Sequence, residues 1–93
     1  MDVVEERRWA WLLYADGDRH VLCVVCGSVA LYELAVELRP AEVDEFRAGG
    51  AAAVDRLARQ MSDALRDHWE RHVAGFNDEP GVREATERWR VTR

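Results

Sequence analysis

The chain has 93 residues, a length typical of one domain with a single hydrophobic core. Hydrophobic residues make up 48% of it and charged residues 33%, a balance that indicates a folded protein and excludes an intrinsically disordered one. The net charge of −5 argues against direct binding of nucleic acid and favours basic protein partners.

No apolar run approaches the length of about 20 residues that a membrane span needs. The segment Met1-Asp2-Val3-Val4-Glu5-Glu6 is too acidic for a secretory signal. We therefore expect a cytoplasmic protein whose cysteines are reduced. All 13 basic residues are arginine, a bias typical of GC-rich genomes, which favours a bacterium or its phage as the source.

Residues 1–7 are expected to be a polar lead-in to a first strand over about 8–15. Runs rich in β-branched residues predict further strands over about 18–26 and 29–39. Between the strands, Asp16-Gly17 and Gly27-Ser28 are signals of two-residue hairpin loops. Together these features predict a three-stranded antiparallel meander.

Two-residue loops also fix the predicted register, which places Leu12 opposite Val21 and Val24 opposite Leu31. One face of the sheet then carries Leu12, Tyr14, Val21, Cys23, Val25, Ala30, Tyr32, Leu34, Val36 and Leu38. The other face carries Trp9, Trp11, Leu13, His20, Leu22, Val24, Cys26, Val29, Leu31, Glu33, Ala35 and Glu37. Because both faces are largely apolar, we expect both to be covered.

Helices are predicted after the sheet. A short helix over about 40–48 starts at Pro40 and stops at Gly49-Gly50. An amphipathic helix follows over about 51–74, which a recapping near residue 62 could split, and a last helix covers about 80–90. The order predicts a single α+β domain over 1–93 with three to four helices packed on the sheet.

The long helix is expected to cover the face that carries Tyr14 and Val21. The face that carries Trp9 and Trp11 is then left for the last helix, a second copy of the chain or a different protein.

Two motifs could bind metal. Cys23 and Cys26 form a C-x-x-C, and His68 and His72 lie one turn apart on the predicted helix. Strand residues three apart point to opposite faces, however, so the cysteines are expected to be small buried residues. A zinc site of these four residues stays as an alternative, and otherwise no metal, cofactor or enzymatic activity is expected, because no catalytic set is evident.

A protein partner is the function that the pattern favours. Trp9 and Trp11 are the expected anchors, because tryptophan is enriched where binding energy concentrates. Acidic residues at Glu33, Glu37, Glu42 and Glu45 are expected to form a rim that steers a basic partner.

The succession Trp11-Leu-Leu-Tyr14, Asp16-Gly17, Leu22-Cys23-Val24-Val25-Cys26-Gly27, Leu31-Tyr32 and Glu37-Leu38 resembles a type of short bacterial protein. In size, acidity and α+β order, the chain also resembles the immunity proteins that neutralise bacterial polymorphic toxins. That resemblance implies a non-enzymatic inhibitor that occludes a cognate toxin encoded beside it. The alternatives are a homodimeric structural or regulatory protein, a phage-encoded inhibitor of a host defence protein, and a small zinc-binding protein.

Overall fold

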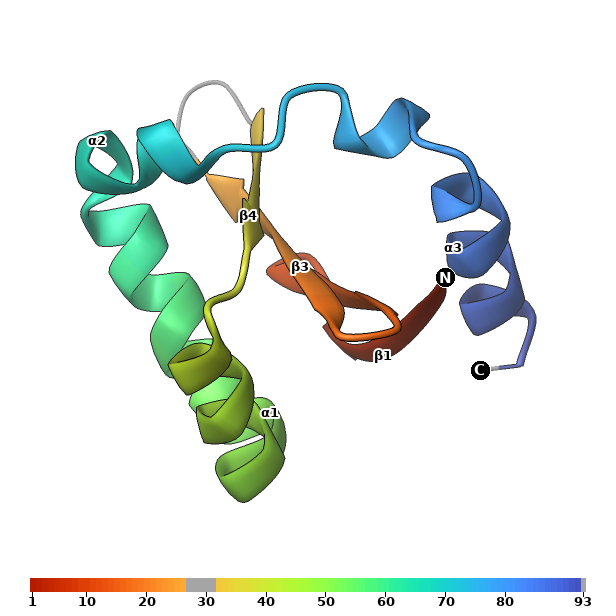
Figure 1. Ribbon diagram of the computed structural model, residues 1–93, viewed down its shortest axis with the longest axis horizontal. Coiled ribbons are helices and arrows are strands. Elements are labelled where there is room, and N and C mark those ends of the chain that lie inside the picture. The colour runs from red at the N-terminus through yellow and green to blue at the C-terminus, as the bar shows by residue number, and fades with distance from the viewer. Residues whose placement is uncertain (27–31, 93) are drawn as a thin grey trace.

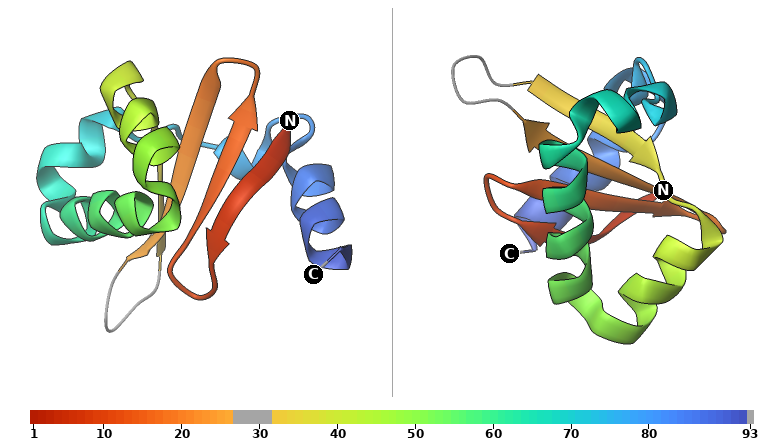
Figure 2. Two further views of the ribbon diagram at one scale, coloured as in Figure 1. Left: turned by 90° about the horizontal axis from the view of Figure 1, so that it is seen from below. Right: turned by 90° about the vertical axis from the view of Figure 1, so that its left-hand side faces the viewer.

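The computed structural model describes residues 1–26 and 32–92, and it shows an α+β protein built on an antiparallel sheet of four strands (Figure 1). The strands lie side by side in chain order, and helices lie on both faces of the sheet (Figure 2). The elements are β1 (Asp2–Arg7), β2 (Trp11–Asp16), β3 (Arg19–Cys26), β4 (Tyr32–Glu37), α1 (Pro40–Asp63), α2 (Leu65–His68), the 3-10 helices η1 (Trp69–Arg71) and η2 (Phe76–Asp78), and α3 (Val82–Val91).

The strand β1 corrects the expectation of a polar lead-in over 1–7. It pairs with β2 as an edge strand, and its register shifts between Val3 and Glu5, where the strand bulges. Val3 is buried in the core, whereas most of the strand is charged. Charges and a bulge protect an edge strand from pairing with other chains, and they also remove the apolar run by which a strand is recognised in sequence.

The turn between β2 and β3 confirms a two-residue loop but moves it by one position. The loop is Gly17-Asp18, not Asp16-Gly17, so Leu12 lies opposite Cys23 and not opposite Val21. The register therefore differs from the prediction by two residues. A shift of two residues leaves every side chain on its predicted face.

The register between β3 and β4 differs from the prediction by an odd number of residues. Val24 lies opposite Leu34, where the prediction placed Leu31. An odd shift moves each side chain of a strand to the other face, so Leu34 and Val36 share a face with Val24. The loop signal Gly27-Ser28, on which the prediction depended, lies outside the described residues.

The helix α1 packs on the face of the sheet that carries Trp11, and it bends sharply within its length (Figure 2). Gly50 adopts φ 62° and ψ −145°, a conformation that only glycine reaches without strain. The predicted break at Gly49-Gly50 is therefore confirmed. The buried residues of this layer are Trp11, Leu13, Leu22, Val24, Cys26, Leu34, Val36, Leu38, Val43, Val54, Leu57, Ala58 and Met61.

The helix predicted over about 51–74 ends earlier, because α1 stops at Asp63. Ala64 leaves the helical conformation with φ −119° and ψ 46°, close to the predicted split near residue 62. The short α2 and η1 follow, and His72 is already extended. No helix in the described ranges combines the length and apolar character of a membrane span.

The segment after η1 closes part of the outer edge of β4. His72 forms an isolated antiparallel bridge with Val36. The Val73 N–H donates to the Ala35 carbonyl at 2.7 Å, and the Ala35 N–H donates to His72 Nδ1 at 3.1 Å. These bonds satisfy strand groups that an open edge would leave unpaired.

The helix α3 and η2 cover the face of the sheet opposite α1 (Figure 2). The buried residues of this layer are Val3, Tyr14, Val21, Cys23, Ala35, Phe76, Val82 and Ala85. Both faces are thus covered, as expected, but the assignment of helices to faces was wrong. The long helix covers the Trp11 face because the odd shift of β4 places Leu34 and Val36 there.

Candidate functional site

Trp9 occupies the middle of the turn that joins β1 to β2. Its side chain is 84% exposed, and its φ is 69°. Among the described residues it is the one non-glycine residue with a positive φ, a conformation that costs a bulky side chain about 1–2 kcal/mol. The turn therefore holds an indole in solvent at an energetic cost, a pattern found where a residue is kept for function.

The local sequence explains this conformation. Arg7 pairs with Trp11, which leaves a hairpin loop over 8–10. Loops of this length need a residue in the left-handed region, and this loop contains no glycine. The Ala10 N–H donates to the Arg7 carbonyl at 2.9 Å, and the Ala10 carbonyl accepts from the Val25 N–H at 2.9 Å. These bonds fix the turn against the end of β3.

Exposed apolar and cationic groups surround the indole. Val25 is 36% exposed, and the Arg8 guanidinium lies 5.5 Å from the centre of the Trp9 ring. Hollows of about 360, 170 and 410 Å³ adjoin Trp9, and they are lined by Arg8 with Arg90, by Val25 with Glu33, and by Asp55 with Arg59. We call Arg8, Trp9, Val25 and Arg90 the Trp9 surface.

Trp11 lies in the core and not beside Trp9. It is 3% exposed and packs under α1, where its indole N–H donates to Asp55 Oδ1 at 2.9 Å. Arg7 also binds Asp55, and the hydrogen bonds from Arg7 and Trp11 hold the pKa of that carboxyl below its usual value. The expected Trp9/Trp11 pair is therefore wrong, because the turn over 8–10 interrupts the strand between them.

The four expected acidic residues do not act as one uncommitted rim. Glu33 accepts a hydrogen bond from the Asn77 side chain at 3.3 Å, and Glu37 accepts one from Arg19 Nε at 2.7 Å. Glu42 pairs with Arg71. Of the four, only Glu45 is exposed with neither an ion pair nor a side-chain hydrogen bond to the described residues. Three of these carboxylates therefore bind groups of their own chain.

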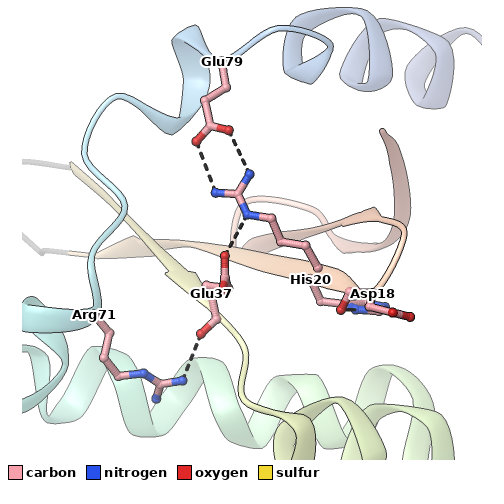
Figure 3. A network of polar contacts seen from close by, with 6 residues as sticks. Asp18, His20, Glu37, Arg71 and Glu79 are labelled. Atoms are coloured by element: carbon pink, nitrogen blue, oxygen red, sulfur yellow. Dashed lines mark hydrogen bonds and ion pairs between the residues drawn. The ribbon is translucent and has the colours of Figure 1, made fainter.

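Arg19 and Arg71 tie the segment between α2 and α3 to the sheet (Figure 3). Arg19 Nη1 lies 2.8 Å from Glu79 and bridges this residue to Glu37, which keeps the pKa of Glu79 below its usual value. Arg71 Nη2 donates to the Glu37 carbonyl at 3.1 Å. This network gives Glu37 of β4 a structural role.

Glu42 is largely buried beneath Arg71, with side-chain exposures of 16% and 15%. Burial raises the pKa of the Glu42 carboxyl, but hydrogen bonds from Arg71 and from the Arg39 N–H outweigh it, so the pKa is lowered. The same Arg39 N–H contact, at 2.8 Å, caps the first turn of α1. Glu42 therefore stabilises the first turn of α1.

The cysteines lie on opposite faces of the sheet, as the strand spacing predicted: Cys23 faces α3 and Cys26 faces α1. His68 ends α2, whereas His72 is extended at the edge of β4, so the predicted helical His pair is wrong. No group of three or more metal-ligating side chains occurs within residues 1–26 and 32–92. The alternative zinc site is therefore not assembled by this fold.

A hollow of about 330 Å³ contains Cys23, His72 and Asn77, residue types that cooperate in thiol proteases. Here burial raises the pKa of the Cys23 thiol far above its usual value, which disfavours the nucleophilic thiolate. His72 Nδ1 already accepts the Ala35 N–H. The Cys23 thiol is therefore not activated as a nucleophile in this hollow.

Arg8, Val25 and Arg90 are the parts of the Trp9 surface that the sequence pattern missed. A signal for Arg8 existed, because Arg7-Arg8-Trp9 breaks the alternation expected of a strand. Arg90 reaches the turn only through the docking of α3 beside β1 (Figure 2).

No protein-family model, curated protein or solved structure matches this chain.

Proposed function

We propose that this chain is a non-enzymatic inhibitor that binds another protein through the Trp9 surface, of the immunity type that neutralises a cognate bacterial toxin by occlusion. The observation that carries the proposal is the exposed indole of Trp9 on a strained backbone. A strained backbone that holds an apolar ring in solvent adds no net stability to the free protein, and a contact that forms on binding would give the ring a role.

The size of that contact is consistent with an anchor residue. The exposed part of an indole amounts to about 200 Å², and burying it in a partner gives a binding contribution of about 2–4 kcal/mol. Val25 adds apolar area beside the ring, and Arg8 and Arg90 are of a residue type that is also enriched at binding anchors.

The acidic residues have a smaller part in this proposal than the sequence suggested. Glu37 and Glu42 are engaged by Arg19 and Arg71, so they contribute to the stability of the fold. Their long-range field still belongs to a chain of net charge −5, which favours a toxin with a basic surface.

A homodimer built on a Trp9/Trp11 face is not proposed, because Trp11 is inside the core of its own chain. Self-association through Trp9 alone is tested by the solution mass from light scattering. A monomer supports the inhibitor, whereas a dimer that Trp9→Gly dissociates would assign the Trp9 surface to a second copy.

The proposal is tested in bacteria that express the neighbouring gene product as the toxin. We expect the unmodified chain to restore growth and Trp9→Gly to fail while remaining folded and soluble. Trp69→Ala is the matched control, because Trp69 is also exposed, at 54%, but lies in η1 with a helical backbone. Equal protection by Trp9→Gly and the unmodified chain would refute the anchor, and absence of any protection would refute the immunity type.

A further inference from the structure

The hollow of about 360 Å³ beside Trp9 collects charges from three separate parts of the chain. Glu6 comes from the end of β1, Arg8 from the turn and Arg90 from the last turn of α3. Figure 2 shows that the β1–β2 turn and the C-terminal end of α3 lie toward the same end of the molecule. We call this feature the arginine hollow.

The carboxylate in the arginine hollow is already engaged. Glu6 Oε1 accepts the indole N–H of Trp89 at 2.8 Å, and Glu6 Oε2 lies 4.0 Å from Arg90 Nη2, at the outer limit of an ion pair. The Glu6 side chain is 22% exposed, whereas that of Arg90 is 63% exposed. Glu6 is therefore largely shielded, and most of the Arg90 side chain is exposed to solvent.

Arg8 is bound less firmly still. It makes neither an ion pair nor a hydrogen bond within the described part of the chain, and its guanidinium lies over the face of the Trp9 ring. By comparison, Arg7, Arg19 and Arg88 each have a carboxylate oxygen within 3.2 Å. One carboxylate and two guanidinium groups leave the arginine hollow with a net positive charge in a chain whose total charge is −5.

We infer that the arginine hollow receives a carboxylate side chain, Asp or Glu, of the protein partner, next to an apolar group of that partner that packs on the Trp9 indole. The inference rests on the proposed function and specifies the chemistry of the partner. Guanidinium groups bind carboxylates through paired hydrogen bonds, and a guanidinium that lies over the face of an indole, as that of Arg8 does, uses none of its N–H groups in that contact. The positive charge is the complement that selects this occupant.

A nuclear magnetic resonance titration tests the inference without the toxin. The probe is the capped peptide acetyl-Glu-Leu-Glu-amide, with acetyl-Gln-Leu-Gln-amide and acetyl-Lys-Leu-Lys-amide as its neutral and cationic counterparts. The readouts are the indole N–H signal of Trp9 and the Nε–H signal of Arg8. We expect saturable shifts with a Kd on the order of millimolar for the Glu peptide and binding about fivefold weaker for the Gln peptide.

Single substitutions locate the binding. Arg8→Gln should weaken binding of the Glu peptide about threefold, and Arg90→Gln by a similar factor. The matched control is Arg83→Gln, which removes an 84% exposed arginine of the same helix that is paired with Glu87, and it should leave binding unchanged. Equal binding of the Glu and Gln peptides, tighter binding of the Lys peptide, or absence of a saturable shift would each overturn the inference.

The two proposals fail in different ways. Suppose that the toxin binds and that Trp9→Gly abolishes this binding, while Arg8→Gln and Arg90→Gln leave it intact. The proposed inhibitor is then supported, and the inference that the arginine hollow receives a carboxylate of the partner is wrong. If the Glu peptide binds as expected but the toxin is not neutralised, the arginine hollow stands and the immunity type is wrong.

Discussion

Replacing Trp9 by glycine and by alanine separates the strain of the turn from the contacts of the indole. At an ordinary loop position alanine is more stable than glycine by about 0.4–1 kcal/mol, because glycine gives the unfolded chain more freedom. At φ 69° the order should reverse, because a side chain there costs about 1–2 kcal/mol, which glycine avoids. We therefore expect Trp9→Gly to be more stable than Trp9→Ala by about 0.5–1 kcal/mol.

The loss of the indole itself should be small. Trp9 is 84% exposed, so the folded chain shields only about 40 Å² of its side chain, which is worth about 1 kcal/mol. The contact with Arg8 adds about 0.5 kcal/mol. Relief of the strained backbone offsets both terms, so Trp9→Gly should keep the stability of the unmodified chain to within about 1 kcal/mol.

Urea unfolding followed by far-ultraviolet circular dichroism measures these differences, provided that the slopes of the three transitions agree. Trp9→Ala more stable than Trp9→Gly would show that the turn carries no strain. A loss of more than about 2 kcal/mol in Trp9→Gly would show that the indole belongs to the core, and the anchor would lose its physical basis.

Two further predictions concern the core and the ion pairs. Trp11→Phe removes the indole N–H that donates to Asp55 and part of a buried ring, so we expect a loss of about 2–3 kcal/mol in urea unfolding; a loss below about 0.5 kcal/mol would contradict the buried position. The pKa of Glu42 in the folded protein lies below its ordinary value of 4.5. Its ion pair with Arg71 therefore stabilises the folded protein above pH 4.5, and this stabilisation is lost as the pH falls through the folded pKa. Glu42→Gln should therefore cost about 1–2 kcal/mol at pH 7 and give a flatter stability profile between about pH 5 and 3, whereas an unchanged profile would show that the pair contributes nothing.

Local signals in the sequence predicted much of the fold. The β-branched run over 21–25 is the centre of the sheet, and Asp16-Gly17 marks a hairpin even though the loop itself is shifted by one residue. Gly49-Gly50 marks the bend of α1, because the conformation of Gly50 excludes other residues. The prediction that both apolar faces of the sheet are covered is also confirmed.

The errors arose where pairing depends on distant residues. The register of β4 was predicted from a loop signal at Gly27-Ser28, and an error of an odd number of residues exchanged the roles of the helices. The strand β1 was missed because its edge is protected by charges. The end of the helical segment near His68 was missed because the apolar stripe continues to His72, whereas the pairing of His72 with β4 draws the chain out of the helix.

The candidate site was half predicted. Trp9 was named as an anchor, but as the partner of Trp11 on one face of a strand, because alternation places residues two apart together. The turn over 8–10 separates them, and its glycine-free sequence conceals it. Arg90 was out of reach of local patterns, since only the packing of α3 places it beside Trp9.

The affinity of Trp9→Gly for the neighbouring toxin is the measurement that tests the central claim most directly. Isothermal titration calorimetry with the unmodified chain, Trp9→Gly and the Trp69→Ala control gives the three Kd values. We predict a loss of about 30-fold or more for Trp9→Gly, with unchanged stability, and a change below about threefold for Trp69→Ala. An unchanged Kd for Trp9→Gly would contradict the claim that this exposed, strained tryptophan is the binding anchor.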